Sequence, residues 1–397
     1  MTEFRTALDP VLSQSIEAGE VPGIAALVVD RKGVLYESAF GLRTLGEPTP
    51  MSSDTVGWIA SMTKAITGAA VMQAVERGLL ELDAPAARVA PEIDTIGVLE
   101  RFEADGTPRF RPPNRPVTLR DLMTHTAGFS YERWSDEVWR CHQALGIPAN
   151  STCKLAMLRS PLMFDPGTRW EYGIGIDWAG RLLEIASGRR LGDWMRDEIF
   201  APLGMRDSAF RITPGMRARL AKMHQRDAAG TIAPLPDFEI PQEPEFEMGG
   251  GGLYSTAADY ARFLRMILNH GELDGARVLR AETVAQMSAD QIPGLEVQPL
   301  RTQVPALSED AEFFPGLSKG WGLSFMINRA DAPTGRPAGS LAWAGLSNCY
   351  YWIDTLNGIA GVFVSQLLPF ADRMVLPRFL AFESAVYRAM NDRRIAA

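Results

Sequence analysis

Residues 61–78 read SMTKAITGAAVMQAVERG, and this stretch decides how the rest of the chain is interpreted. After Lys64 it is apolar almost all the way round until Gly78, which predicts a helix buried through a core and stopped by glycine. In such a helix Ser61 and Lys64 share a face, and the serine lies at the positive N-terminal end. A lysine held in a dry pocket can lose its proton near neutral pH and act as a base. The spacing therefore predicts that Lys64 activates the Ser61 hydroxyl without help from histidine.

The same spacing occurs a second time and serves as an internal control. Ser151-Thr152-Cys153-Lys154 lies in a polar stretch after Pro148 and Asn150, where a capping serine at a helix start explains the pattern. A capping serine followed by a surface lysine is also the ordinary alternative for Ser61. The buried helix that follows Ser61 favours the catalytic interpretation there.

Composition narrows the class of protein. The chain has 397 residues, 46% of them hydrophobic and 22% charged, so it can bury a large core. Its net charge of −8 and the absence of a basic cluster argue against a nucleic-acid partner. The charged first residues and the lack of a run near the ~20 apolar residues of a membrane span predict a cytoplasmic protein without a membrane contact. Three cysteines form no metal or disulfide framework, and we expect them to be reduced and structural, with no cofactor.

Strand signals occur at both ends of the chain. An amphipathic helix over 3–19 precedes a hairpin of strands at 23–30 and 34–41, and a helix over 373–391 closes the chain. Four more apolar runs predict strands at 321–328, 340–345, 348–354 and 359–366.

The part between the two strand groups is mostly helical in pattern. We therefore predict an α/β protein of the α+β type, in which 1–60 and 320–397 form a sheet lobe and 61–319 form an inserted helical lobe. The Ser61 helix would lie at the interface, and the cleft between the lobes is the expected active site. Long loops are predicted at 105–116, 234–247 and 291–319, as walls or lids of the site or as decoration.

Two further motifs carry chemistry. Tyr172, in DPGTRWEYGIG at 165–175, follows a predicted loop; beside a lysine ammonium its pKa can fall, so that it shuttles protons. Trp343-Ala344-Gly345 lies on a predicted strand, where glycine would let a substrate carbonyl approach and the Leu346 N–H could point at it. The alternatives are a packing tyrosine and a tryptophan in a sheet core.

In this order and spacing the three motifs resemble the serine penicillin-recognising hydrolases. These comprise class C β-lactamases, D-alanyl-D-alanine peptidases and, most closely, family VIII carboxylesterases. The segments DLMTHTAGF at 121–129 and GGGGLYSTAADYARF at 249–263 strengthen the resemblance. It implies a β-lactamase-like fold, with a five-stranded antiparallel sheet flanked by helices and a helical lobe.

The resemblance also implies roles for particular residues. Ser61 is then the nucleophile, Lys64 its activating base and Tyr172 the proton relay. The backbone N–H groups of Ser61 and Leu346 form the oxyanion hole.

Departures from the class C pattern bear on the substrate. Ile174 replaces the asparagine of Tyr-x-Asn, and Trp343 replaces the lysine of Lys-Thr-Gly. Losing both polar groups argues for a neutral, more apolar acyl substrate, and Trp-x-Gly is similar to the family VIII pattern. Trp58 and Trp134 are further aromatic candidates for an ester pocket or for the core. The candidate substrate-binding residues are Trp343, Gly345, Phe129, Tyr131 and Trp170.

Competing motifs do not fit. No Gly-x-Ser-x-Gly elbow is present, and the run 249–252 lacks the lysine of a phosphate loop, so it is interpreted as a tight approach before a helix capped by Ser255 or Thr256. The spacing of His125, His224 and His270 predicts no metal site. A histidine-dependent triad stays open as a minor alternative, with His125 expected to be structural near a helix C-terminus.

These observations predict a serine esterase acting on short- to medium-chain carboxylic esters, with weak β-lactam hydrolysis as a side activity. The alternatives are a β-lactamase or D-alanyl peptidase, an acyltransferase or amidase, and a non-catalytic binding protein. A small-molecule ester is the expected partner, and the sequence does not predict the oligomeric state.

Overall fold

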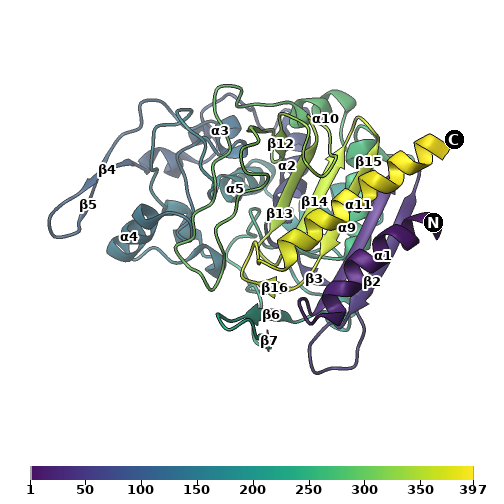
Figure 1. Cartoon of the computed structure of the whole chain (residues 1–397). Coiled ribbons are helices and arrows are strands. Elements are labelled where there is room, and N and C mark those ends of the chain that lie inside the picture. Colours follow the sequence, from purple (N-terminus) through teal and green to yellow (C-terminus); the bar gives the residue numbers. More distant parts are fainter. Residues whose placement is uncertain (1, 397) are drawn as a thin grey trace.

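A computed structural model describes residues 2–396, in which segments from both ends of the chain build one sheet (Figure 1). Seven strands pair in the order β11-β12-β13-β14-β15-β1-β2, and every pair is antiparallel. The strands are β1 (Gly23–Asp30), β2 (Val34–Gly41), β11 (Lys319–Trp321), β12 (Met326–Asn328), β13 (Leu341–Gly345), β14 (Cys349–Asp354) and β15 (Ile359–Val364). The predicted fold class is confirmed, although the sheet has seven strands where five were expected.

One predicted strand was wrong in detail. The run 321–328 contains a turn, in which the Gly322 N–H bonds the Phe325 carbonyl at 2.7 Å and Ser324 has φ +80°. The turn separates β11 from β12, which then pair with each other. A residue with a left-handed backbone does not continue a strand.

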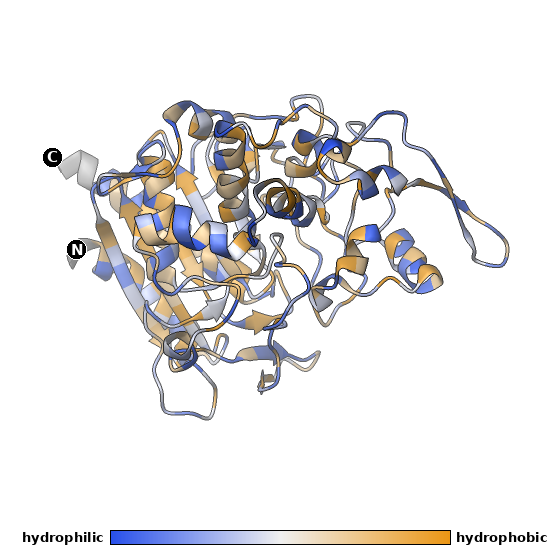
Figure 2. Ribbon diagram, turned by 180° about the vertical axis from the view of Figure 1, so that it is seen from behind, coloured by the Kyte–Doolittle hydropathy of each residue, from blue (hydrophilic) through white to orange (hydrophobic). Residues whose placement is uncertain are grey.

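Helices cover both faces of the sheet. α1 (Thr2–Glu17) and α11 (Val375–Ala396) pack together on one face, where Trp352 contacts the ring of Phe379 at 5.9 Å. α9 (Ala257–Leu268) packs against β1 and β15 on the other face, where Tyr351 meets Tyr260 at 5.3 Å. Neighbouring residues of β14 thus serve opposite faces, as the period of a strand requires. Figure 2 shows orange, apolar stretches along strands of the sheet, and every residue of β14 and β15 is buried, in keeping with cover on both sides.

The nucleophile helix runs through the core. A 3₁₀ turn, η1 (Ala60–Met62), leads into α2 (Thr63–Glu76), and every residue from Thr63 to Ala74 is buried. α2 packs against α5 (Gly175–Ser187). The prediction of a buried helix is confirmed, with the difference that Ser61 belongs to the 3₁₀ turn ahead of α2.

Shorter elements complete the described chain. The other α-helices are α3 (Leu119–Met123), α4 (Asp136–Leu145), α6 (Leu191–Met195), α7 (Ala201–Leu203), α8 (Pro214–Arg217) and α10 (Ala281–Ser288). The other strands are β3 (Gly57–Trp58), β4 (Val98–Phe102), β5 (Pro108–Arg111), β6 (Met223–Arg226), β7 (Ile232–Leu235), β8 (Tyr254–Ser255), β9 (Glu272–Leu273), β10 (Ala276–Arg277) and β16 (Leu367–Leu368).

The predicted long loops differ in character. The segment 105–116 contains β5, which forms a hairpin with β4 that projects from the body in Figure 1. The segment 234–247 begins at the end of β7. Residues 291–318 contain no helix and no strand of a sheet, as expected for a long loop.

Among residues 2–396, no helix combines the length and apolar character needed to cross a bilayer. The cytoplasmic location and the division into two lobes stay predictions.

Candidate active site

A strained turn presents Ser61. Ala60, directly before it, has φ +45°, a left-handed conformation that is costly for a residue with a side chain. The turn is held from two sides: the Ile59 N–H bonds the Leu253 carbonyl at 3.0 Å, and a Cβ on Gly345 would lie 2.3 Å from the Ile59 carbonyl oxygen. Only glycine at the end of β13 allows this approach. Gly345 therefore packs against the nucleophile turn, and its expected contact with a substrate carbonyl stays a prediction.

Lys64 is fully buried, and its amine lies next to the Ser61 hydroxyl. Its Nζ donates hydrogen bonds to Ser61 Oγ at 3.1 Å, to the Tyr131 hydroxyl at 3.1 Å and to the Gly250 carbonyl. Burial lowers the pKa of Lys64 to about 7, and the negative charge of Asp177 acts in the opposite direction. The side chain can therefore exchange a proton with Ser61 near neutral pH, as the sequence predicted.

Tyr172 reaches the same serine from the loop before α5. Its ring lies 4.7 Å from Lys64 Nζ, and its oxygen accepts a hydrogen bond from Trp343 Nε1 at 3.0 Å. Burial raises the pKa of Tyr172, while hydrogen bonds from Ser61 and Trp343 oppose the shift. The expectation of a lowered tyrosine pKa was wrong, because desolvation disfavours the phenolate more than these contacts favour it. The hydroxyl stays protonated and can donate a proton.

Aromatic rings surround this centre. Tyr172 contacts Tyr131 at 5.3 Å, Trp134 at 5.3 Å and Trp343 at 4.9 Å. His125 packs edge-on against Tyr172 at 4.8 Å, and its Nδ1 accepts a hydrogen bond from the Gly173 N–H. Burial lowers the pKa of His125 well below its usual value, so the ring is neutral. Within the described residues no hydrogen bond joins His125 to Ser61, which agrees with a structural role.

A hollow of about 670 Å³ opens beside Tyr172. One wall comes from the segment around Trp134 and Trp170, and the opposite wall from Leu295–Arg301 in the long loop. Trp170 lines the hollow although only 2% of its surface is exposed to solvent. The loop 291–318 thus forms a wall of the hollow next to the reacting groups.

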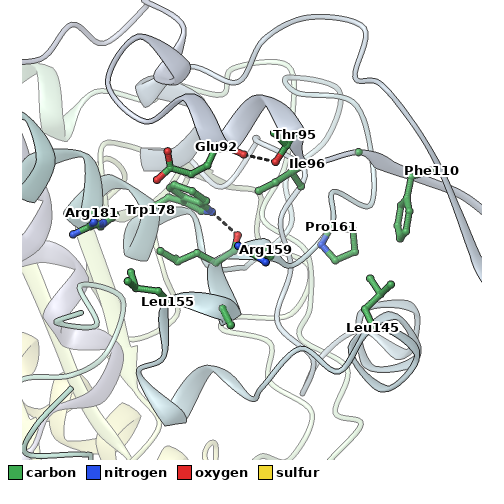
Figure 3. Close-up of a pocket in the computed structure, with 13 residues that line it drawn as sticks. Glu92, Thr95, Ile96, Phe110, Leu145, Leu155, Arg159, Pro161, Trp178 and Arg181 are labelled. Atoms are coloured by element: carbon green, nitrogen blue, oxygen red, sulfur yellow. Dashed lines mark hydrogen bonds between the residues drawn. The ribbon is translucent and has the colours of Figure 1, made fainter. Parts of the chain in front are cut away.

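A second hollow, of about 800 Å³, lies away from this chemistry (Figure 3). Trp178 forms part of it and donates its indole N–H to the Leu158 carbonyl at 3.0 Å. Tyr172 lines the first hollow but not this one, and Ser61 and Lys64 are lining residues of neither. We therefore place the candidate active site at Ser61, Lys64 and Tyr172, beside the hollow of about 670 Å³.

The other predicted residues fall in different places. Phe129 packs in the core against Trp178 at 6.4 Å, while Tyr131 joins Lys64 directly. Leu346 follows Gly345 in the turn after β13, and its N–H has no hydrogen-bond acceptor among the described residues. The assignment of Leu346 to an oxyanion hole stays a prediction.

The internal control behaves differently from Ser61. Ser151 and Lys154 are both exposed, and no hydrogen bond joins their side chains in the described chain. Ser151 lies inside a 3₁₀ turn whose N-cap is Ala149, so the capping role expected for it was wrong. The expected capping of α9 holds at Thr256, whose side chain accepts from the Asp259 N–H at 3.0 Å. Among the described residues, no cluster of His, Cys, Asp or Glu side chains could hold a metal ion.

Sequence reasoning missed Asp177. It is fully buried at the start of α5, where its carboxylate accepts the Gly250 N–H at 2.8 Å and the Tyr131 hydroxyl at 3.3 Å. The available signal was an acid in the apolar run GIDWAGRLL, which a helix start also explains.

A beta-lactamase family model matches residues 8–385. The chain belongs to this family. It is 33% identical over 397 residues to a lovastatin esterase of Penicillium rubens, covering 96% of this chain and 98% of that protein. It is 30% identical over 411 residues to the monacolin J acid methylbutanoyltransferase of Aspergillus terreus, covering 96% of each.

Solved structures extend the comparison. A LovD6 mutant of simvastatin synthase from Aspergillus terreus superposes with a TM-score of 0.85 at 28% identity, covering 98% of both chains. EstCE1, a hydrolase with promiscuous acyltransferase activity, shares the fold with a TM-score of 0.77 at 21% identity, covering 97% of this chain and 99% of its own. The protein is thus an enzyme of the beta-lactamase-like serine hydrolase superfamily, as the sequence motifs predicted.

Proposed function

We propose that this protein is a carboxylesterase of the family VIII type, which cleaves neutral esters through an acyl-enzyme on Ser61. The observation that carries the proposal is the 3.1 Å contact between Ser61 Oγ and the buried amine of Lys64. The Tyr172 hydroxyl forms a hydrogen bond with the same serine. Buried lysine and protonated tyrosine give the site a base and an acid at the same pH.

Acylation follows from these positions. Neutral Lys64 takes the proton of Ser61 as Oγ attacks the ester carbonyl, and the N–H groups of Ser61 and Leu346 bind the oxyanion. As the tetrahedral intermediate collapses, Tyr172 donates its proton to the leaving alkoxide and regains one from the Lys64 ammonium. The free alcohol departs, and Lys64 is neutral again.

Deacylation reverses the roles. Water replaces the alcohol and gives a proton through Tyr172 to Lys64 as it attacks the acyl carbon. The Ser61–acyl bond breaks, the carboxylic acid leaves, and Ser61 regains its proton from Lys64. No other co-substrate is needed.

The replaced positions support a neutral substrate. Ile174 is buried at the start of α5, and the Trp343 indole is committed to Tyr172, so neither supplies a charge to a β-lactam. Because Tyr172 protonates the leaving group, the hollow of about 670 Å³ beside it takes the alcohol part of the ester. The relative named lovastatin esterase supports an ester as the substrate. We therefore assign this chain short to medium acyl groups on bulky alcohols.

Acyl transfer is the second candidate. The methylbutanoyltransferase matches 96% of this chain at 30% identity, close to the match of the esterase. Both reactions share the acyl-enzyme and differ in whether water or an alcohol accepts the acyl group.

Turnover of p-nitrophenyl butyrate, compared with a chromogenic cephalosporin and with Ser61→Ala as the blank for both, tests the proposal. A large Ser61-dependent preference for the ester is expected. A preference for the cephalosporin would contradict the assignment and indicate a β-lactamase. Adding an alcohol acceptor and measuring the ratio of new ester to free acid separates the esterase from the acyltransferase.

A further inference from the structure

Asp177 is connected to Lys64 along two separate paths. One carboxylate oxygen accepts the Gly250 N–H at 2.8 Å, and the Gly250 carbonyl accepts from Lys64 Nζ. The other oxygen accepts the Tyr131 hydroxyl at 3.3 Å, and the Tyr131 oxygen accepts from Lys64 Nζ at 3.1 Å. The two hydrogen-bond acceptors of Lys64 other than Ser61 are therefore both fixed by the same Asp177 carboxylate.

These two contacts orient the amine. A neutral amine has two N–H groups and one lone pair. If the N–H groups go to Gly250 and Tyr131, the lone pair is left for the Ser61 hydroxyl, 3.1 Å away. A lysine without these acceptors would rotate and offer the serine an N–H about twice as often as the lone pair.

The backbone at Gly250 is shaped for this contact. A Cβ on Gly250 would lie 2.5 Å from an Asp177 carboxylate oxygen, so no larger residue fits without moving the carboxylate. The Gly249 carbonyl next to it accepts the Thr67 hydroxyl of α2 at 2.7 Å, which fixes the glycine segment to the nucleophile helix.

We propose that Asp177 is a positioning residue for catalysis: through Tyr131 and Gly250 it aims the Lys64 lone pair at Ser61. The negative charge of the same carboxylate also acts on the protonation of Lys64. This inference rests on the proposed function. Without this role, Asp177 would be explained as an acidic residue that stabilises the first turn of α5.

The sign of the charge effect follows from the surroundings. Burial and the guanidinium of Arg133 lower the pKa of Lys64, and Asp177 raises it. Removing the negative charge must therefore lower the pKa of Lys64 further and extend activity to lower pH. The groups that face the Lys64–Asp177 pair are Arg133, Tyr131, Tyr172, His125 and Cys153.

Asp259 provides a matched control. Like Asp177, it occupies the third position of its helix, is buried, and accepts one backbone N–H, from Asp207, and one hydroxyl, from Ser208. It makes no contact with Lys64 or Ser61 among the described residues. Asp259→Asn thus reproduces the structural loss of Asp177→Asn without the connection to the amine.

The test measures the rate of Ser61 labelling by a fluorophosphonate, and of p-nitrophenyl butyrate turnover, from acid to alkaline pH. For Asp177→Asn we expect the acid limb of both profiles to move down by about one pH unit or more, as for loss of an opposite charge nearby. The plateau rate should fall at least ~10-fold through lost orientation. Tyr131→Phe keeps the charge, so it should lower the plateau with a smaller shift of the limb. Thermal unfolding checks that each variant is folded.

Two results would overturn the inference: an unshifted acid limb in folded Asp177→Asn, or equal shifts in Asp177→Asn and Asp259→Asn. If Asp177→Asn does not fold, Tyr131→Phe with an unchanged plateau rate overturns the positioning role by itself. Failure of the proposed function looks different, because the wild-type protein would then not be labelled at Ser61 or would not turn over the ester.

Discussion

The indole N–H of Trp343 donates a 3.0 Å hydrogen bond to the hydroxyl oxygen of Tyr172. This bond joins the sheet position that replaces a β-lactamase lysine to the tyrosine that faces Ser61. An oxygen that accepts from Trp343 keeps its own proton available for donation. The tryptophan thus orients the acid of the site.

Replacing Trp343 by phenylalanine should weaken this orientation while keeping an aromatic ring against Tyr172. We expect kcat for p-nitrophenyl butyrate to fall by about 10-fold, the cost of about one hydrogen bond to a polar group in a dry site. Steady-state kinetics on the folded variant check the value. An unchanged kcat would show that the bond does not act on Tyr172 during turnover.

Replacing Tyr172 by phenylalanine removes the proton donor itself. We expect kcat to fall by about 10²- to 10⁴-fold, the usual contribution of acid–base catalysis. Tyr387→Phe is the control. Tyr387 is a buried residue of α11, and its hydroxyl donates a hydrogen bond to Asp354 at the end of β14. Equal losses in the two variants would point to a general effect of losing a buried hydroxyl.

The pH dependence follows from Lys64. Its active form is the neutral amine, and burial lowers its pKa to about 7, so kcat/KM should rise with pH and level off above that value. Below it the ammonium cannot accept the serine proton. Lys64→Arg should abolish activity across the range, because a guanidinium does not lose its proton. A flat profile between pH 5 and 9 in the wild type would contradict lysine as the base.

The strained turn at Ala60 depends on Gly345. In Gly345→Ala the new methyl group would lie 2.3 Å from the Ile59 carbonyl oxygen, so the nucleophile turn must move. We expect a loss of about 1–3 kcal/mol in the free energy of unfolding, measured by denaturant titration, and a larger relative loss of activity. Gly215→Ala is the control, since a Cβ there meets nothing within 4 Å. Full activity in Gly345→Ala would show that this contact is dispensable.

The hollow beside Tyr172 makes a prediction about substrate size. Gln298 lies exposed on its rim, so Gln298→Trp adds bulk there with little effect on the core. We expect kcat/KM to fall several-fold for butyrate esters of bulky alcohols and to stay near the wild-type value for ethyl butyrate. A uniform change across alcohols would place the leaving group elsewhere.

Much of the fold was predictable because its signals are local. The strands at 23–30 and 34–41 have the predicted ends, since apolar runs and turn residues mark both sides. The break between β11 and β12 was not predictable, because an unremarkable serine, Ser324, adopts the left-handed conformation. Tertiary contacts decide that conformation, and they leave no pattern in the sequence.

The site shows the same division. Ser61 and Lys64 were found from their spacing within one helical turn. Asp177 was missed because its partners, Tyr131 and Gly250, are 46 and 73 residues away along the chain and meet it only in the folded structure. The direction of the Tyr172 pKa was wrong for a related reason: the depth of burial, which dominates it, cannot be judged from neighbours in the chain.

The central claim is an acyl-enzyme on Ser61, and acid-quenched mass spectrometry during turnover of p-nitrophenyl butyrate tests it most directly. A butyryl group mapped to the peptide that contains Ser61, absent from Ser61→Ala and accumulating further in Tyr172→Phe, is the predicted result. Ester turnover without a butyryl adduct on Ser61, or with the adduct on another residue, would contradict the claim.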